Sequence, residues 1–272
     1  MKKSAPMFNI QSNIVNTKLT RLWATKTKDD EWWSSFVTSP LAIVLNYFVV
    51  DIKWLTPNFI TLISFITAIL ASLLIVVGGN SNFVCAAVLI HLSHVFDCMD
   101  GQMARYRKIT SQLGAYYDRI TDQIQVIIWF GAVAYAAYKQ SDNVLPIFLA
   151  FIGVAFYSLR GYIKYVMIYI KMSQDSQYLE ALTKIESTTK KEDSAGLKFG
   201  FLANLKWFLA EQRKILAFNE GVFIFMLSLA LVLDEIMPML WVFALTQLYI
   251  GLMRSWQRSD QIKNYVISII NK

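Results

Sequence analysis

The feature that most limits how this chain can fold is an uncharged run that extends from Thr56 to Val77. It opens with threonine followed by Pro57, a good helix start because threonine suits the N-cap and proline the first helical position. The run is about twenty residues long, which is the length that a helix needs to cross the hydrocarbon core of a bilayer. Charged residues make up only 17% of the chain, whereas soluble domains carry about a quarter. The sequence therefore predicts a helical membrane protein.

Further apolar segments have the length and composition of membrane spans. Together they predict an all-α, polytopic membrane protein with six transmembrane helices, at about residues 57–77, 82–100, 114–138, 144–170, 218–233 and 239–253. Ahead of them, residues 40–50 repeat apolar side chains at helical spacing but end at Asp51, too early to span a bilayer. Trp32 and Trp33 precede this segment, and tryptophan favours the headgroup level of a membrane. We therefore expect an N-terminal amphipathic helix that lies in the interface.

The lysine and arginine residues are distributed unevenly about the six predicted spans. All but one of the 26 would lie on the side that holds both termini, and the exception is Lys139. Loops rich in lysine and arginine stay in the cytoplasm, so both termini are predicted to be cytoplasmic. Residues 1–38 would then form a basic cytoplasmic arm, residues 39–272 the membrane domain, and residues 171–217 a cytoplasmic loop.

Four aspartates stand where the second predicted span ends and the third begins. Asp97 and Asp100 are three residues apart, and Asp118 and Asp122 are four apart, so each pair shares one face of its helix. The segment from Asp122 to Lys139 is shorter than a full span, which places the acids within the membrane or at its border. Bare carboxylates are strongly disfavoured there. Hard divalent cations such as Mg²⁺ accept carboxylate and phosphate oxygens, and two of them can clamp a phosphoryl group. The aspartates therefore predict metal-dependent phosphoryl transfer.

Small residues and one arginine lie between the aspartates. Gly101, Ala104 and Gly114 would leave room for a nucleotide against the helix backbones. Arg105 can hold a phosphate through paired donors. Each residue alone has a plainer explanation, because glycine and alanine in membrane helices commonly serve helix packing. The complete set at fixed spacing favours a nucleotide site.

The whole pattern from Asp97 to Asp122 reads D-x2-D-G-x2-A-R-x8-G-x3-D-x3-D. It resembles, without a gap, the signature of the CDP-alcohol phosphotransferases, which are also called CDP-alcohol phosphatidyltransferases. Thr56-Pro57-Asn58 is similar to the start of that family's first span. The plan of six spans after an interfacial helix is similar as well, so the resemblance covers most of the chain from about Pro40.

The resemblance implies a role for each signature residue. Asp122 would be both a metal ligand and the general base. The other ligands of two Mg²⁺ or Mn²⁺ ions would be Asp97, Asp100 and Asp118. The pocket for CDP would be lined by Gly101, Ala104, Arg105 and Gly114. The family also implies a homodimer whose active site faces the cytoplasm and opens to the bilayer. We expect it in the inner membrane of a bacterium or archaeon.

Four polar residues outside the signature are further candidates. Asn58 and Thr61 would border the cytidine, although both residue types are also common as caps near helix N-termini. Arg160 and Lys164 are one turn apart near the cytoplasmic end of the fourth span. They would either bind an anionic acceptor or extend to the lipid headgroups.

Two histidines precede the signature at spacings of three. His91 and His94 would continue the stripe of Asp97, but steps of three lag behind the turn of the helix. We expect hydrogen-bonded contacts between helices at these positions, and metal ligation is the alternative.

The leading functional prediction is a phosphatidyltransferase of phospholipid biosynthesis that uses CDP-diacylglycerol and a small polar acceptor and releases CMP. Within the same class, a CDP-choline or CDP-ethanolamine donor could react with diacylglycerol, and the motif does not separate the two. An ion-binding transporter belongs to another class, but its site would lie near the midplane on interrupted helices. The acceptor stays open between glycerol phosphate, inositol phosphate, inositol, serine, choline and a glycan headgroup. We expect membrane lipid and no nucleic acid among the partners.

Overall fold

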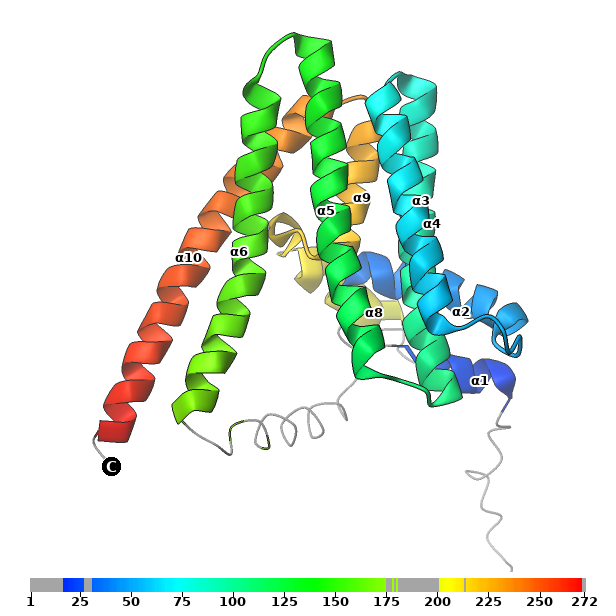
Figure 1. The fold of residues 1–272 in the computed structure, drawn as a ribbon, viewed down its shortest axis with the longest axis horizontal. Helices are drawn as coiled ribbons and strands as arrows, with labels where there is room; N and C mark the ends of the chain where they lie inside the picture. Colours follow the sequence, from blue (N-terminus) through cyan, green and yellow to red (C-terminus); the bar gives the residue numbers. More distant parts are fainter. Residues whose placement is uncertain are drawn as a thin grey trace, which may run out of the picture.

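The computed structural model describes residues 17–26, 31–174, 178, 180, 201–212 and 214–270. Within these ranges the regular structure is entirely helical, as predicted (Figure 1). Much of the predicted basic arm, residues 1–16 and 27–30, lies outside the described residues. The lysine-rich centre of the predicted loop at 171–217 lies outside them as well.

Five of the described helices are long and apolar enough to cross a membrane. They are α3 (Pro57–Val77), α4 (Asn80–Arg107), α5 (Gln112–Ser141), α6 (Leu145–Gln174) and α10 (Ile236–Ile270). Their bounds follow five of the predicted spans, and α4, α5 and α10 extend further than expected. α6 and α10 pack against each other and lie side by side in Figure 1.

The remaining predicted span is occupied by α9 (Glu220–Val232), which has 13 residues. At 1.5 Å per residue such a helix is about 20 Å long, less than the hydrocarbon core of about 30 Å. Six full-length spans are therefore not found among the described residues. The short helices α8 (Phe201–Gln212) and η3 (Ile215–Ala217) precede α9, which packs against α4.

Short N-terminal helices cover one end of the bundle (Figure 1). They are α1 (Lys18–Trp23), the π-helical turn η2 (Ser34–Thr38) and α2 (Ser39–Val49). A buried amide on α2, that of Asn46, joins this layer to α4. Its Nδ2 donates to the carbonyl of Met99 (2.9 Å) and to Oε1 of Gln102 (3.2 Å). Gln102 Nε2 in turn donates to the carbonyl of Ser39 (3.0 Å). α2 is therefore fixed beside the signature half of α4.

A single arginine fixes the corner between α2 and α3. The guanidinium of Arg107, in the last turn of α4, donates to the carbonyls of Val50 (2.8 Å), Ile52 (2.8 Å) and Leu55 (2.6 Å). The linker then reaches Thr56, whose hydroxyl accepts the N–H of Phe59 and caps α3. α3 therefore begins at a defined place beside the end of α4.

The opposite half of the bundle is apolar and aromatic. The rings of Phe130 on α5 and Phe243 on α10 stack with centroids 3.8 Å apart and an interplanar angle of 8°. Both side chains are fully buried. α6 approaches this pair at Gly153, where an added Cβ would lie 2.3 Å from Cδ1 of Phe243. Such a separation is too short for a van der Waals contact, so α6 can pack this closely only with glycine at that position.

Replacing Gly153 by alanine is expected to destabilise the bundle by about 1–3 kcal/mol, the usual cost of forcing an extra methyl group into a packed core. Phe243 cannot yield easily, because it is stacked on Phe130. The free energy of unfolding in detergent should fall for Gly153→Ala. The control is Gly131→Ala on α5, whose new Cβ would have no neighbour within 4 Å. Equal stability of the two variants would show that this contact does not matter.

Candidate active site

The signature aspartates converge across a space between α4 and α5. Asp97 and Asp100 on α4 and Asp118 on α5 each offer a carboxylate oxygen, and the three oxygens lie within 4.8 Å of one another. α3 packs against both α4 and α5 and supports the two helices that carry the acids. Three of the four signature aspartates therefore lie close together.

These carboxylates could hold a divalent cation. Asp100 Oδ2 accepts a hydrogen bond from the hydroxyl of Thr61, which orients the carboxylate. Asp97 Oδ1 is buried and has no hydrogen-bond partner among the described residues. Buried polar atoms are seldom left without a partner, and one in a group of acids points to an absent ligand. An all-oxygen set of this kind fits Mg²⁺ or Mn²⁺.

Beside the aspartates lies a cavity of about 320 Å³, which we call the nucleotide-side cavity. All six residues predicted to contact CDP line it: Asn58, Thr61, Gly101, Ala104, Arg105 and Gly114. Asp100 and Asp118 line it too. The structure therefore brings together residues of α3, α4 and α5 that are far apart in the sequence.

The glycines of the signature adjoin polar side chains in this cavity. A Cβ on Gly101 would lie 3.1 Å from Nη1 of Arg105, and one on Gly114 would lie 3.4 Å from Oδ1 of Asn58. Arg105 is held in place, because its Nε donates to the carbonyl of Thr25 (2.7 Å). Glycine at position 101 therefore leaves room for the guanidinium, whereas at position 114 the tighter contact of an added Cβ would be with Oγ of Ser111 (3.1 Å).

A second, larger cavity of about 840 Å³ lies between α5, α6 and α9, and we call it the α5–α6 cavity. Asp122 lines it, one helical turn after Asp118, which lines the nucleotide-side cavity. Aromatic side chains, among them Trp129 and Tyr157, form much of the wall. Among the described residues, Asp122 belongs to neither group of three whose ligand atoms lie within 4.8 Å. Its predicted metal ligation therefore stays a prediction.

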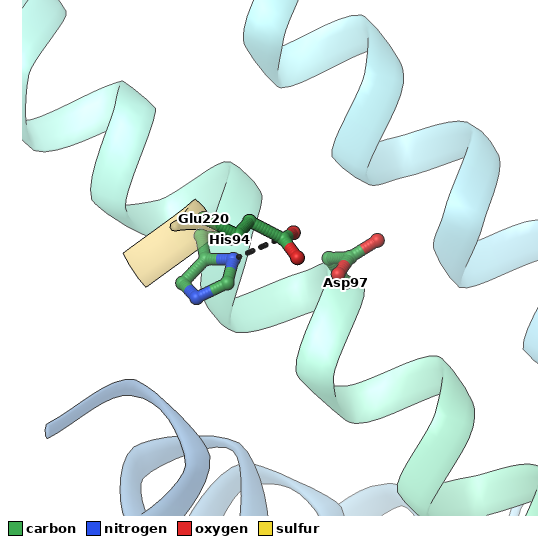
Figure 2. Close-up of side chains that lie close together, drawn as sticks. All are labelled: His94, Asp97 and Glu220. Carbon is green, nitrogen blue, oxygen red and sulfur yellow. Dashed lines mark ion pairs between the residues drawn. The ribbon is translucent and has the colours of Figure 1, made fainter. Parts of the chain in front are cut away.

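A further acid meets the signature from α9. His94, Asp97 and Glu220 form a second group with ligand atoms within 4.8 Å of one another (Figure 2). His94 Nδ1 lies 3.5 Å from Glu220 Oε1, and its Nε2 lies 3.0 Å from the hydroxyl of Ser34. Glu220 was not predicted from the sequence, because nothing in its neighbourhood indicates a contact with a residue more than a hundred positions earlier.

The loop before η2 supports this group through Glu31. Glu31 Oε2 accepts hydrogen bonds from the hydroxyl of Ser34 (3.0 Å) and from the backbone N–H of Gly221 (3.1 Å). Burial raises the pKa of Glu31, and the neighbouring carboxylate of Glu220 raises it further. The two hydrogen bonds oppose this shift by stabilising the ionised form.

The candidates on α6 line a third cavity, of about 380 Å³. We call it the basic cavity, because its lining includes Arg160, Lys164, Arg254 and Arg258. Arg160 Nη1 also donates to the carbonyl of Ala217 (2.5 Å) and to Oε1 of Gln247 (2.6 Å). The guanidinium therefore contacts protein groups, which differs from simple extension towards lipid headgroups.

His91 makes the contact between helices that its position predicts. Its Nδ1 lies 2.9 Å from the carbonyl of Ala87 and 3.1 Å from the hydroxyl of Ser228 on α9. The expectation of a hydrogen-bonded contact is confirmed for His91.

The apolar helices and the acids beside two cavities define a membrane-embedded transferase of phosphate-containing groups. The family model of the CDP-alcohol phosphatidyltransferases matches residues 54–189, which is half of the 272 residues. The chain belongs to this family. The matched residues include all eight signature positions and the predicted contacts on α3 and α6.

Two relatives match shorter segments. The chain is 30% identical over 102 residues to a protein of Thermococcus kodakarensis named "Bifunctional IPC transferase and DIPP synthase", covering 38% of this chain and 23% of that protein. It is 32% identical over 100 residues to an uncharacterized protein of Aquifex aeolicus, covering 36% of this chain and 50% of the relative. The chain thus matches half or less of the length of each relative.

Replacing Gly101 by alanine is expected to weaken the binding of CDP about tenfold, on the order of one lost hydrogen bond to a charged group. The new methyl group would lie 3.1 Å from Nη1 of Arg105, so the guanidinium would have to shift away from its present position while its Nε is bonded to the carbonyl of Thr25. Titration calorimetry with CDP and Mg²⁺ measures the change, and Gly131→Ala serves as the control. An unchanged affinity of Gly101→Ala for CDP would contradict this role of the glycine.

Proposed function

We propose that the protein transfers the phospho-alcohol group of a CDP-alcohol, with CDP-diacylglycerol as the leading donor, to an acceptor hydroxyl and releases CMP. The reaction belongs to phospholipid biosynthesis and takes place at the cytoplasmic face of a bacterial or archaeal inner membrane. The observation that carries the proposal is that two acids one turn apart on α5 line two different cavities. Asp118 lines the nucleotide-side cavity and Asp122 lines the α5–α6 cavity.

The two cavities suit the two substrates of a direct displacement. The nucleotide-side cavity would hold CDP, with Arg105 donating to the diphosphate and Asn58 and Thr61 beside the cytidine. The α5–α6 cavity would hold the acceptor. The acceptor and CMP would then lie on different sides of the reacting phosphorus, as an in-line displacement requires.

Divalent cations have a defined place in this proposal. Asp97, Asp100 and Asp118 would hold them, with Asp122 as a further ligand. Two bound Mg²⁺ or Mn²⁺ ions would neutralise the diphosphate and stabilise the charge that develops on CMP. The unpartnered oxygen of Asp97 supports this use of the acids.

The protein side chains would move the proton. The acceptor oxygen forms a bond to the phosphorus that bears the alcohol, while the bond from this phosphorus to the bridging oxygen of CMP breaks. The acceptor hydroxyl loses its proton to Asp122, which lines the acceptor's cavity. CMP leaves with the electron pair of the broken bond, and Arg105 donates hydrogen bonds to it.

The basic cavity favours a phosphorylated acceptor. It shares Gln123, Tyr157 and Gly161 with the α5–α6 cavity, so the two cavities adjoin each other. Lys164 and three arginines would hold an acceptor phosphate there while the acceptor's hydroxyl extends towards Asp122. The sequence candidates Arg160 and Lys164 are thus proposed as acceptor contacts. A homodimer, as the family resemblance implies, completes the proposal.

Asp122→Asn is expected to abolish CMP release with the fold intact, because an amide cannot take the proton of the acceptor. The assay uses purified protein, CDP-diacylglycerol, Mg²⁺ and a panel of glycerol 3-phosphate, inositol 1-phosphate, inositol, serine and choline. Asp142→Asn, an exposed position just after the far end of α5, removes the same charge and serves as the control. Turnover retained by Asp122→Asn would remove its role as base. Transfer from CDP-choline to diacylglycerol alone would favour the other donor.

Removal of divalent metal should stop the reaction, because the clustered carboxylates would then repel the diphosphate. EDTA is expected to abolish CMP release, and an excess of Mg²⁺ or Mn²⁺ should restore it. The same EDTA treatment followed by Ca²⁺ tests whether any divalent charge suffices. A rate that EDTA leaves unchanged would contradict the use of metal.

A further inference from the structure

We propose that Glu220 contacts the acceptor: its carboxylate accepts a hydrogen bond from a second hydroxyl of a phosphorylated polyol, next to the hydroxyl that attacks. This proposal rests on the transferase function proposed above. It adds a residue that lies outside the signature and outside residues 54–189, which the family model matches.

The first argument is the position of Glu220 in the α5–α6 cavity. Its side chain is 44% exposed, and it lines this cavity together with Asp122. Two carboxylates from different helices thus face the same space. Since Asp122 is assigned to the attacking hydroxyl, Glu220 is available to a different group of the same molecule. A carboxylate accepts hydrogen bonds and donates none, so that group must be a donor.

The second argument is that Glu220 is held in a closed ring of contacts. His94, only 4% exposed, lies between Glu220 Oε1 (3.5 Å) and the hydroxyl of Ser34 (3.0 Å), and Figure 2 shows its imidazole turned towards Glu220. Ser34 donates to Glu31, and Glu31 accepts the N–H of Gly221, the next residue after Glu220. Groups that bind a substrate precisely are commonly fixed by such supporting contacts.

The glycine after Glu220 makes this ring possible. A Cβ on Gly221 would lie 2.3 Å from Oγ and 3.0 Å from the backbone nitrogen of Ser34. The start of α9 therefore touches the first residue of η2 without an intervening side chain. On the other side, Arg160 and Gln247 hold the turn before α9 through the carbonyls of Ala217 and Leu216. Glu220 is thus fixed from both directions.

The third argument identifies the donor as a hydroxyl. An ammonium group would also donate to Glu220, but the α5–α6 cavity adjoins the basic cavity, whose four cationic side chains repel it. Those cations attract a phosphate. A phosphorylated polyol suits the two adjoining cavities, with its phosphate among the arginines and its hydroxyls between Asp122 and Glu220.

The test compares acceptors that differ by one hydroxyl. Glycerol 3-phosphate is paired with 3-hydroxypropyl phosphate, and inositol 1-phosphate with its analogue that lacks the neighbouring hydroxyl. CDP-diacylglycerol and Mg²⁺ are present throughout, and CMP release is measured. Glu220→Gln should raise the KM for the complete polyol phosphate about tenfold, the effect of one charge-assisted hydrogen bond. The KM values for the deoxy analogue and for CDP-diacylglycerol should stay the same.

A matched control removes the same charge from the link between α9 and α10. Glu235→Gln, an exposed position beyond the far end of α9, should behave as wild type.

Three results would overturn the proposal. An equal rise of KM for the polyol phosphate and its deoxy analogue would show that Glu220 has a structural role only. A tenfold loss of Mn²⁺ affinity in Glu220→Gln, measured by electron paramagnetic resonance, would make it a metal ligand. Wild-type CMP release with serine or choline but with no polyol phosphate would remove the acceptor class, while leaving the transferase function standing. Absence of CMP release with every acceptor would instead reject the proposed function itself.

Discussion

The structure depends on the placing of several carboxylates at one depth of a membrane protein. Carboxylate oxygens of Asp97, Asp100 and Asp118 lie within 4.8 Å of one another, and an oxygen of Glu220 lies within 4.8 Å of one from Asp97. Like charges at such distances repel strongly unless something positive stands among them. Part of this positive charge comes from His94 and Arg105, which lie beside the acids on two sides. One buried oxygen of Asp97 has no partner among the described residues, and a bound cation, as proposed above, would supply the remaining positive charge.

The half of the bundle that holds the acids and the half that lacks them are stabilised by different interactions. The half beside the acids is tied by hydrogen bonds from Asn46, Gln102 and Arg107 to carbonyl and amide oxygens. Each such bond contributes about 1 kcal/mol, and more where the donor is charged. The other half is packed by aromatic rings around Phe243. Helices in lipid gain little from the hydrophobic effect, so directional bonds and close packing must hold them.

What the sequence could predict of this site is the part that is local in the chain. The signature lies on two consecutive helices, and its spacing places Asp97 and Asp100 on one face of the first. The family resemblance predicted that Asp118 joins them, and the three carboxylates lie in one group. The residues predicted to contact CDP line one cavity. The five long helices were readable from composition in the same way. Composition did not predict how short α9 is, since an apolar run does not show where a helix begins. Glu31 and Glu220 were missed because their meeting is set by tertiary packing of distant segments.

The division between the two cavities also explains why the signature does not define the acceptor. The nucleotide-side cavity is built by α3, α4 and α5 within the residues that the family model matches. The space proposed for the acceptor is completed by side chains beyond that segment: Glu220, Phe223 and Ile224 on α9, and Arg254 and Arg258 on α10. A motif that fixes the metal and nucleotide chemistry can therefore remain the same while α9 and α10 change what is recognised. In this chain those helices contribute one carboxylate and two guanidinium groups, which together complement a molecule carrying both hydroxyls and a phosphate.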